Sequence, residues 1–145
     1  MKMTNTNLYP SLLIMFIGSF IVQYFIMSRV MSNSITNITN SLGKFYLSVL
    51  MGLLMVLIEL LMAESSAIFL YLFIIFLIVI TIYFYRNQVF IGEKEYISDM
   101  IEHHSMAILT SEEILKKTDN AKVANLANRI VQAQTEEIQE MQQLL

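Results

Sequence analysis

Three long apolar segments constrain the fold of this chain more than any other feature of its sequence. They cover about residues 11–30, 45–62 and 67–85. Each is close to the roughly 20 residues that a helix needs to cross the hydrocarbon of a bilayer. Each is apolar all round, without the polar face of a helix at the surface of a soluble protein. We therefore predict three transmembrane helices, with the lipid bilayer as a partner.

The sequence after residue 92 predicts two amphipathic helices. Apolar residues recur every three or four positions from about Glu93 to Lys117, and again from Ala121 to about Leu144. Asn120 is placed to cap the second helix. Helices joined by so short a connection run antiparallel. The predicted fold is all-α, with a membrane domain at 1–86, a linker at 87–92 and a helical hairpin domain at 93–145.

Composition excludes several classes of function. The chain has no cysteine, which rules out disulfides, thiolate catalysis and cysteine-ligated metal sites. The formal net charge is −3, and the acidic excess lies in the last 60 residues, with ten acidic against six basic side chains. Since phosphate binding needs a basic face, nucleic acid is not an expected partner.

Histidine and methionine gather at one end of the predicted hairpin. With the turn centred near Asp119, His104 lies opposite Gln134, and Met100, His103 and Met141 fall near it. Neutral imidazole and thioether are ligands suited to copper, and the soft thioether selects Cu(I). The cluster therefore predicts a copper site.

A second interpretation of the same residues needs no metal. Here His104 is a buried histidine bonded to Gln134, His103 is exposed and the methionines are packing residues. In the metal interpretation, Asp99 accepts the second ring N–H of His103 as an outer-shell partner. A di-iron enzyme would need a glutamate three positions before a histidine, which neither histidine has. We therefore do not expect an enzyme.

The segment 96–145 carries the runs Met100-Ile101-x-His103-His104-x-Met106-Ala107, Leu126-Ala127-x-x-Ile130, Ala133-Gln134 and Glu137-Ile138-x-x-Met141. In these positions it resembles the family catalogued as domain of unknown function 305, a ferritin-like helical domain that includes bacterial copper-resistance proteins. The resemblance implies copper as the ligand and adds Met106 to the metal-binding set. Glu102 stands where the family usually has proline, and it places a carboxylate beside the ligands. The run Ala107–Glu112, with Tyr46, Met51-Gly52 and Met55, is similar to the branch of the family that has three N-terminal spans.

The second apolar segment carries its own pattern. Met51, Met55 and Glu59 recur every four residues, on one helical face, with Met62 close by. An acid within a span suggests function by default, here a cation path through the membrane. Ordinary methionine packing, with Glu59 reaching water at the helix end, is the alternative.

Two functions follow from these features. The first is an integral membrane protein that binds copper and buffers it or hands it on. The second is a structural membrane module whose hairpin mediates oligomerisation without metal. In both cases the apolar stripes of the hairpin are broader than one seam requires. We expect a homodimer in which two hairpins complete a four-helix bundle.

The charges near the span ends predict the orientation. Arg29 and Lys44 flank the first connection, and Arg86 and Lys94 follow the third span, against Lys2 alone on the other side. The positive-inside rule then places the hairpin in the cytoplasm. The family resemblance implies the opposite, a hairpin on the exported side.

Overall fold

The computed structural model describes residues 5–145, with side chains from Leu8 onward. The chain folds into two compact units. The three-helix unit contains the residues up to Ile26 together with Leu42–Phe90, and the hairpin unit contains Met27–Ser41 together with Ile91–Leu145. Lys2, which entered the charge count above, lies outside the described residues.

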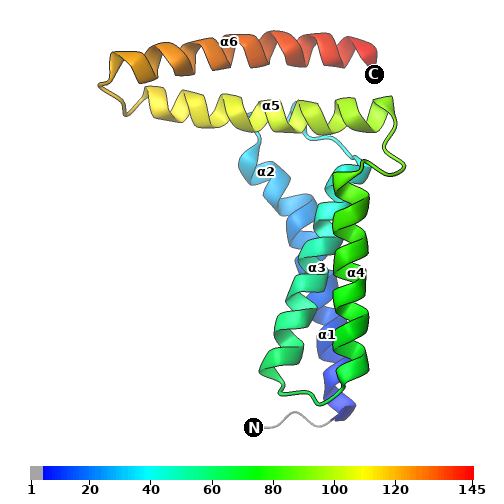
Figure 1. Ribbon diagram of the computed structural model, residues 1–145. Helices are drawn as coiled ribbons and strands as arrows, with labels where there is room; N and C mark the ends of the chain where they lie inside the picture. Colours follow the sequence, from blue (N-terminus) through cyan, green and yellow to red (C-terminus); the bar gives the residue numbers. More distant parts are fainter. Residues whose placement is uncertain (1–4) are drawn as a thin grey trace. The chain divides into compact units, whose positions relative to one another are not determined.

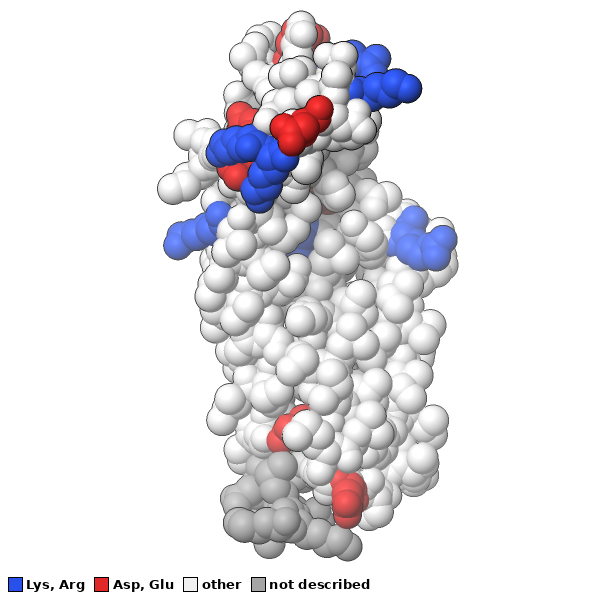
Figure 2. Space-filling view, turned by 90° about the vertical axis from the view of Figure 1, so that its left-hand side faces the viewer, with Lys and Arg blue, Asp and Glu red and all other residues white. Residues whose placement is uncertain are grey.

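Three helices are long and apolar enough to cross a membrane, as the sequence predicts. They cover Leu8–Met31, Leu42–Met62 and Ile68–Arg86. The first consists of α1 (Asn5–Ile21), a π-helical turn η1 (Val22–Met27) and the short α2 (Ser28–Met31), whereas the second and third are α3 (Leu42–Met62) and α4 (Ile68–Arg86). Over the middle of the three-helix unit, the face in Figure 2 carries no charged side chain.

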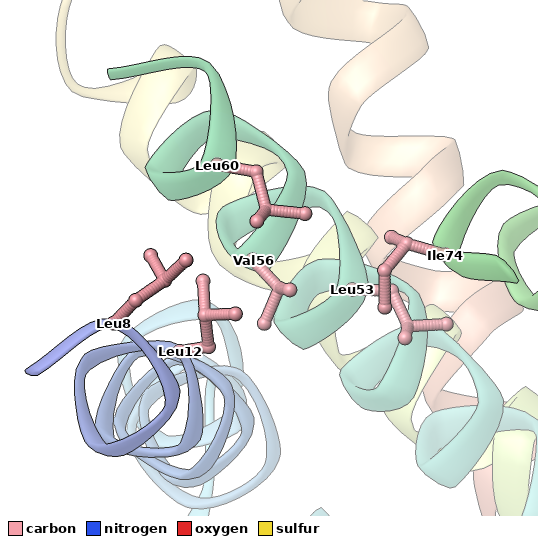
Figure 3. Close-up of a cluster of buried hydrophobic side chains, with 6 residues drawn as sticks. All are labelled: Leu8, Leu12, Leu53, Val56, Leu60 and Ile74. Carbon is pink, nitrogen blue, oxygen red and sulfur yellow. The ribbon is translucent and has the colours of Figure 1, made fainter. Parts of the chain in front are cut away.

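The core of the three-helix unit lies where α3 packs between α1 and α4 (Figure 1). Leu8 and Leu12 from α1 point toward Val56 of α3, and Leu53 faces Ile74 of α4 (Figure 3). A hydrogen bond also joins α3 and α4, in which the Tyr71 hydroxyl donates to the Leu60 carbonyl at 2.7 Å.

The predicted C-terminal hairpin is confirmed. Its helices are α5 (Glu93–Leu115) and α6 (Ala121–Leu144), which run antiparallel (Figure 1). They pack through the buried residues Ile101, Ile108 and Ile138. Asn120 caps α6 as expected, since its side chain accepts from the backbone N–H of Lys122 at 3.0 Å.

The segment Ser32–Ser41, called here the polar connection, follows α2 and belongs to the hairpin unit. Its sequence predicts only a loop, and it contains one short 3-10 turn, η2 (Ile35–Asn37). Polar side chains hold it against α5, with one further contact from Gln142 of α6 to Asn37. The hairpin therefore has a partner on one of its sides within the same chain.

Candidate functional site

His104 is the most constrained of the predicted ligands. Its Nδ1 lies 2.8 Å from the carbonyl oxygen of Met100, one turn earlier in α5, and its Nε2 lies 2.6 Å from Oε2 of Glu137 in α6. Because a carbonyl oxygen only accepts, Nδ1 carries a proton. The side chain is 18% exposed. Its ring is thus fixed in orientation, with Nε2 directed across the hairpin.

The partner of His104 is Glu137, not the predicted Gln134. Side chains of an α-helix lean toward its N-terminus. In an antiparallel pair, side chains on the two helices therefore meet when they are offset by about one turn. Gln134 still belongs to the group, because its amide donates to the same Glu137 oxygen at 3.4 Å. The same offset brings Met100 level with Met141, which packs against the hairpin core.

The other predicted ligands are placed differently around α5. His103 is exposed, beside His104 and on the side of Met100. Met106 is two residues beyond His104, which is about 200° around the helix at 100° per residue. The structure thus brings His104, Glu137 and Gln134 together, and it does not bring Met106 to them.

Asp99 and Glu102 face away from His104 and bind the polar connection. Glu102 accepts from the Ser28 hydroxyl at 3.1 Å and from the backbone N–H of Thr39 at 2.6 Å. Asp99 accepts from the Ser41 hydroxyl. The hydrogen bond of Asp99 is thus to Ser41, and His103, one turn later in α5, lies near enough to affect its charge.

The environment of Asp99 raises the pKa of its carboxyl. Burial raises the pKa of the Asp99 carboxyl above 3.8, and the hydrogen bond from Ser41 opposes this shift. The neighbouring carboxylates of Glu102 and Glu95 raise the pKa further, while His103 lowers it. The Asp99 carboxyl thus lies where burial and neighbouring carboxylates disfavour its charged form.

Ser105 is the centre of the contact between α5 and the polar connection. It is fully buried. Its hydroxyl lies 2.5 Å from that of Ser32, donates to the Asn33 side-chain oxygen at 2.6 Å and accepts from the Asn33 backbone N–H at 3.0 Å. Neither this role nor that of Glu137 was predicted. A serine on the buried face of an amphipathic helix was the available signal for Ser105.

The methionine and glutamate stripe of α3 lies at the edge of the three-helix core. Glu59 accepts from the Ser11 hydroxyl of α1 at 2.5 Å. Met55 is half-buried, whereas Met51 and Met62 are 40% and 74% exposed. Glu59 thus has a helix-to-helix contact, and the methionines on either side of it reach the outer surface.

Within the part of the chain that the structure describes, no group of three or more histidine, aspartate or glutamate side chains is arranged to hold a metal ion. The nearest approach is His104 with Glu137. Any site for a soft ion in the hairpin therefore depends on thioether sulfur beside imidazole, in line with the ligand chemistry of Cu(I).

Comparison with known proteins also distinguishes the hairpin from the three apolar helices. Residues 88–145 match the family described as a domain of unknown function, DUF305. Over 137 residues the chain is 37% identical to an uncharacterized protein of Acanthamoeba polyphaga mimivirus, covering 92% of this chain and 90% of that protein. No solved structure shows significant similarity. The similarity to the viral protein includes the three apolar helices as well as the hairpin, and by these matches the chain belongs to the DUF305 family.

Proposed function

We propose that this protein is a membrane-anchored copper-binding protein whose hairpin holds Cu(I) and buffers it or hands it on. The observation that carries the proposal is the state of His104. A metal-binding histidine commonly donates its second ring N–H to a backbone carbonyl, which fixes the tautomer. His104 makes this contact with Met100, and its Nε2 is the nitrogen directed toward the other helix.

In the proposed site, Nε2 of His104, the nitrogen directed toward α6, would bind Cu(I). His103 supplies a second imidazole, and Met100 and Met141 supply thioether sulfur. Gln134 and Glu137 lie around these ligands. The Glu137 carboxylate would balance the positive charge of the metal, and Gln134 would keep Glu137 hydrogen-bonded after metal binding breaks its contact with His104. Met106 stays outside it because of its direction from α5. Two imidazoles and two thioethers select a soft monovalent ion over zinc or magnesium.

The test is a Cu(I) titration of the full chain in detergent against a competing Cu(I) chelator. We expect His103→Ala/His104→Ala to lose most of the Cu(I) affinity. Met100→Leu and Met141→Leu should each weaken binding more mildly, since leucine keeps the volume and removes the sulfur. Met106→Leu is the matched control, on the same helix but directed elsewhere. Helicity is measured for each variant, and unchanged affinity in the double histidine variant rejects the site.

A competing function is structural, with His104 and Glu137 acting only as a clasp between α5 and α6. The two functions differ in their response to Glu137→Gln. If the contact is only structural, Glu137→Gln lowers the thermal stability of the protein. Added Cu(I) then leaves the thermal stability of the parent and of every variant unchanged. A copper site gains stability when Cu(I) is added, because a ligand that binds only the folded state stabilises it. Neither function involves catalysis, and we propose none.

We further propose that the three apolar helices span the bilayer, with the hairpin in the cytoplasm. The polar connection and the hairpin are separated in sequence by α3 and α4, yet they share one compact unit. Two crossings return the chain to its starting side, so this contact supports two spanning helices between them.

The orientation is tested with single cysteines, because the chain has none of its own. Glu64→Cys lies in the turn between α3 and α4, and Asp119→Cys lies in the hairpin turn; both positions are exposed. A thiol reagent that cannot cross the membrane, applied to intact cells, should label position 64 and spare position 119. The reverse pattern places the hairpin on the exported side.

A further inference from the structure

One side of the hairpin is apolar and exposed, and we call it the open face. The polar connection occupies the opposite side of α5, through Ser98, Glu102 and Ser105. The open face has Tyr96, Ala107 and Ile114 on α5, and Leu126, Ala133 and Leu144 on α6. Tyr96 and Leu126 are 55% and 50% exposed. Surface of this kind in two neighbouring helices is typical of an interface.

The open face has a symmetric arrangement of side-chain sizes. Ala107 and Ala133 lie at about the same level of the antiparallel hairpin, given the contact of His104 with Glu137. Met100 and Ile114 each lie seven residues, or two turns, from Ala107. Small residues at the centre permit close approach of two helices, and larger apolar residues on both sides fill the space beyond.

The charge along α6 is arranged in two halves. Lys122 and Arg129 lie in its first half, and Glu136, Glu137 and Glu140 lie in its second half, all of them exposed. An antiparallel pair of α6 helices centred on Ala133 sets the basic half of each against the acidic half of the other. Arg129, four residues before the centre, is then within one residue of the level of Glu136, three residues after it, and the two lie on the same side of α6 because they are seven residues apart.

Other ways of pairing two hairpins do not set opposite charges against each other. If α6 instead packed on α5 of a second copy, its basic half would meet Glu112, Glu113, Lys116 and Lys117, which carry both signs. A parallel pair of α6 helices would set like charges together. Opposed charges at an interface fix its register and direction.

We propose that the open face binds the open face of a second copy about a twofold axis that passes between Ala107 and its equivalent and between Ala133 and its equivalent. The result is a four-helix bundle in which α5 packs antiparallel on α5 and α6 on α6. This pairing goes beyond the proposed copper site and requires no metal, so it is measured without copper.

The pairing is tested by cysteine cross-linking of the full chain in detergent and in lipid nanodiscs. Because the chain has no cysteine, each variant carries a single thiol. Ala107→Cys and Ala133→Cys lie at the axis and should each form a disulfide-linked dimer on mild oxidation. Gln139→Cys, exposed on another side of α6, is the control and should form no disulfide-linked dimer.

Two further variants test the chemistry of the interface. Leu126→Asp changes an exposed side chain, so it should keep the helicity of the chain and weaken dimerisation about tenfold or more. Arg129→Glu should weaken dimerisation about two- to fivefold, and Arg129→Glu/Glu136→Arg should restore it. Sedimentation in detergent measures the association.

Three results overturn the proposal. One is a monomer that gives no cross-link at position 107 or 133. Another is a cross-link that forms only when Ala107→Cys and Ala133→Cys chains are mixed, which means α5 packs on α6 of the second copy. The third is an open face that is protected by lipid in nanodiscs while the chain remains monomeric, which means that the bilayer covers it.

Discussion

The contact between α1 and α3 depends on the absence of a side chain at Gly52. A Cβ atom at this position would lie 2.7 Å and 2.9 Å from two ring carbons of Phe16, and 3.1 Å from the Phe16 carbonyl oxygen. Real Cβ contacts are longer, so in Gly52→Ala the Phe16 ring must shift, and the α1 backbone at the Phe16 carbonyl must give by a few tenths of an ångström. Small residues that permit such approach are typical of helix packing in membranes.

The size of the effect follows from two opposed terms. Alanine in place of glycine within a helix gains about 1 kcal/mol in helix propensity. Overpacking a well-filled contact costs about 1–3 kcal/mol. We expect Gly52→Ala to be less stable than the parent by up to about 2 kcal/mol. Gly18→Ala, inside α1 with no atom within 4 Å of the added Cβ, is the matched control and should be at least as stable as the parent.

The measurement is unfolding in mixed micelles with increasing dodecyl sulfate, followed by helicity. Phe16→Leu is combined with Gly52→Ala in a double-mutant cycle, because a smaller side chain at position 16 should relieve part of the clash with the ring. We expect a coupling of about 1 kcal/mol between the two positions. If Gly52→Ala is as stable as Gly18→Ala, or if the coupling is absent, the close approach of the two helices is wrong.

Three further predictions concern the hairpin unit. Asn120→Ala should cost about 1 kcal/mol, as loss of a helix cap does, and an unchanged midpoint of thermal unfolding would contradict the capping role. Ser105→Ala should speed hydrogen exchange at the Asn33 amide by about tenfold, because the buried acceptor of that N–H is lost, whereas Thr110→Ala should leave the exchange unchanged. The raised pKa of Asp99 means that its carboxylate opposes folding above that pKa and that the penalty disappears as the pH falls toward 3.8. Asp99→Asn should therefore be more stable than the parent at pH 7 and equal to it near pH 3.5, and equal stability at both pH values would show that the charge has no cost.

The sequence was sufficient for features that depend on local pattern. Apolar runs and helical periodicity located every long helix to within a few residues, and Asn120 was recognised as a cap from its place before an amphipathic segment. These features depend on neighbours within one or two turns, which a single sequence displays.

Contacts between distant segments could not be predicted in the same way. The polar connection has no apolar pattern, and its partners on α5 are more than fifty residues away, so nothing local distinguishes it from a solvent-exposed loop. The partner of His104 was displaced by almost one turn, from Gln134 to Glu137, because side-chain direction adds an offset that counting from the turn omits.

The docking of the polar connection on α5 has a consequence for the order in which the protein is assembled. Its hydrogen-bond partners belong to a helix that is synthesised only after α3 and α4 have left the ribosome. Until then Thr39, Asn33 and Ser32 cannot form their hydrogen bonds with α5. The connection therefore folds late, although it lies early in the chain, and this non-local closure slows its formation. A chain that stops short of α5 would leave this early segment without the surface on which it folds. A truncation at the C-terminal end would therefore also unfold the connection between the first two long helices.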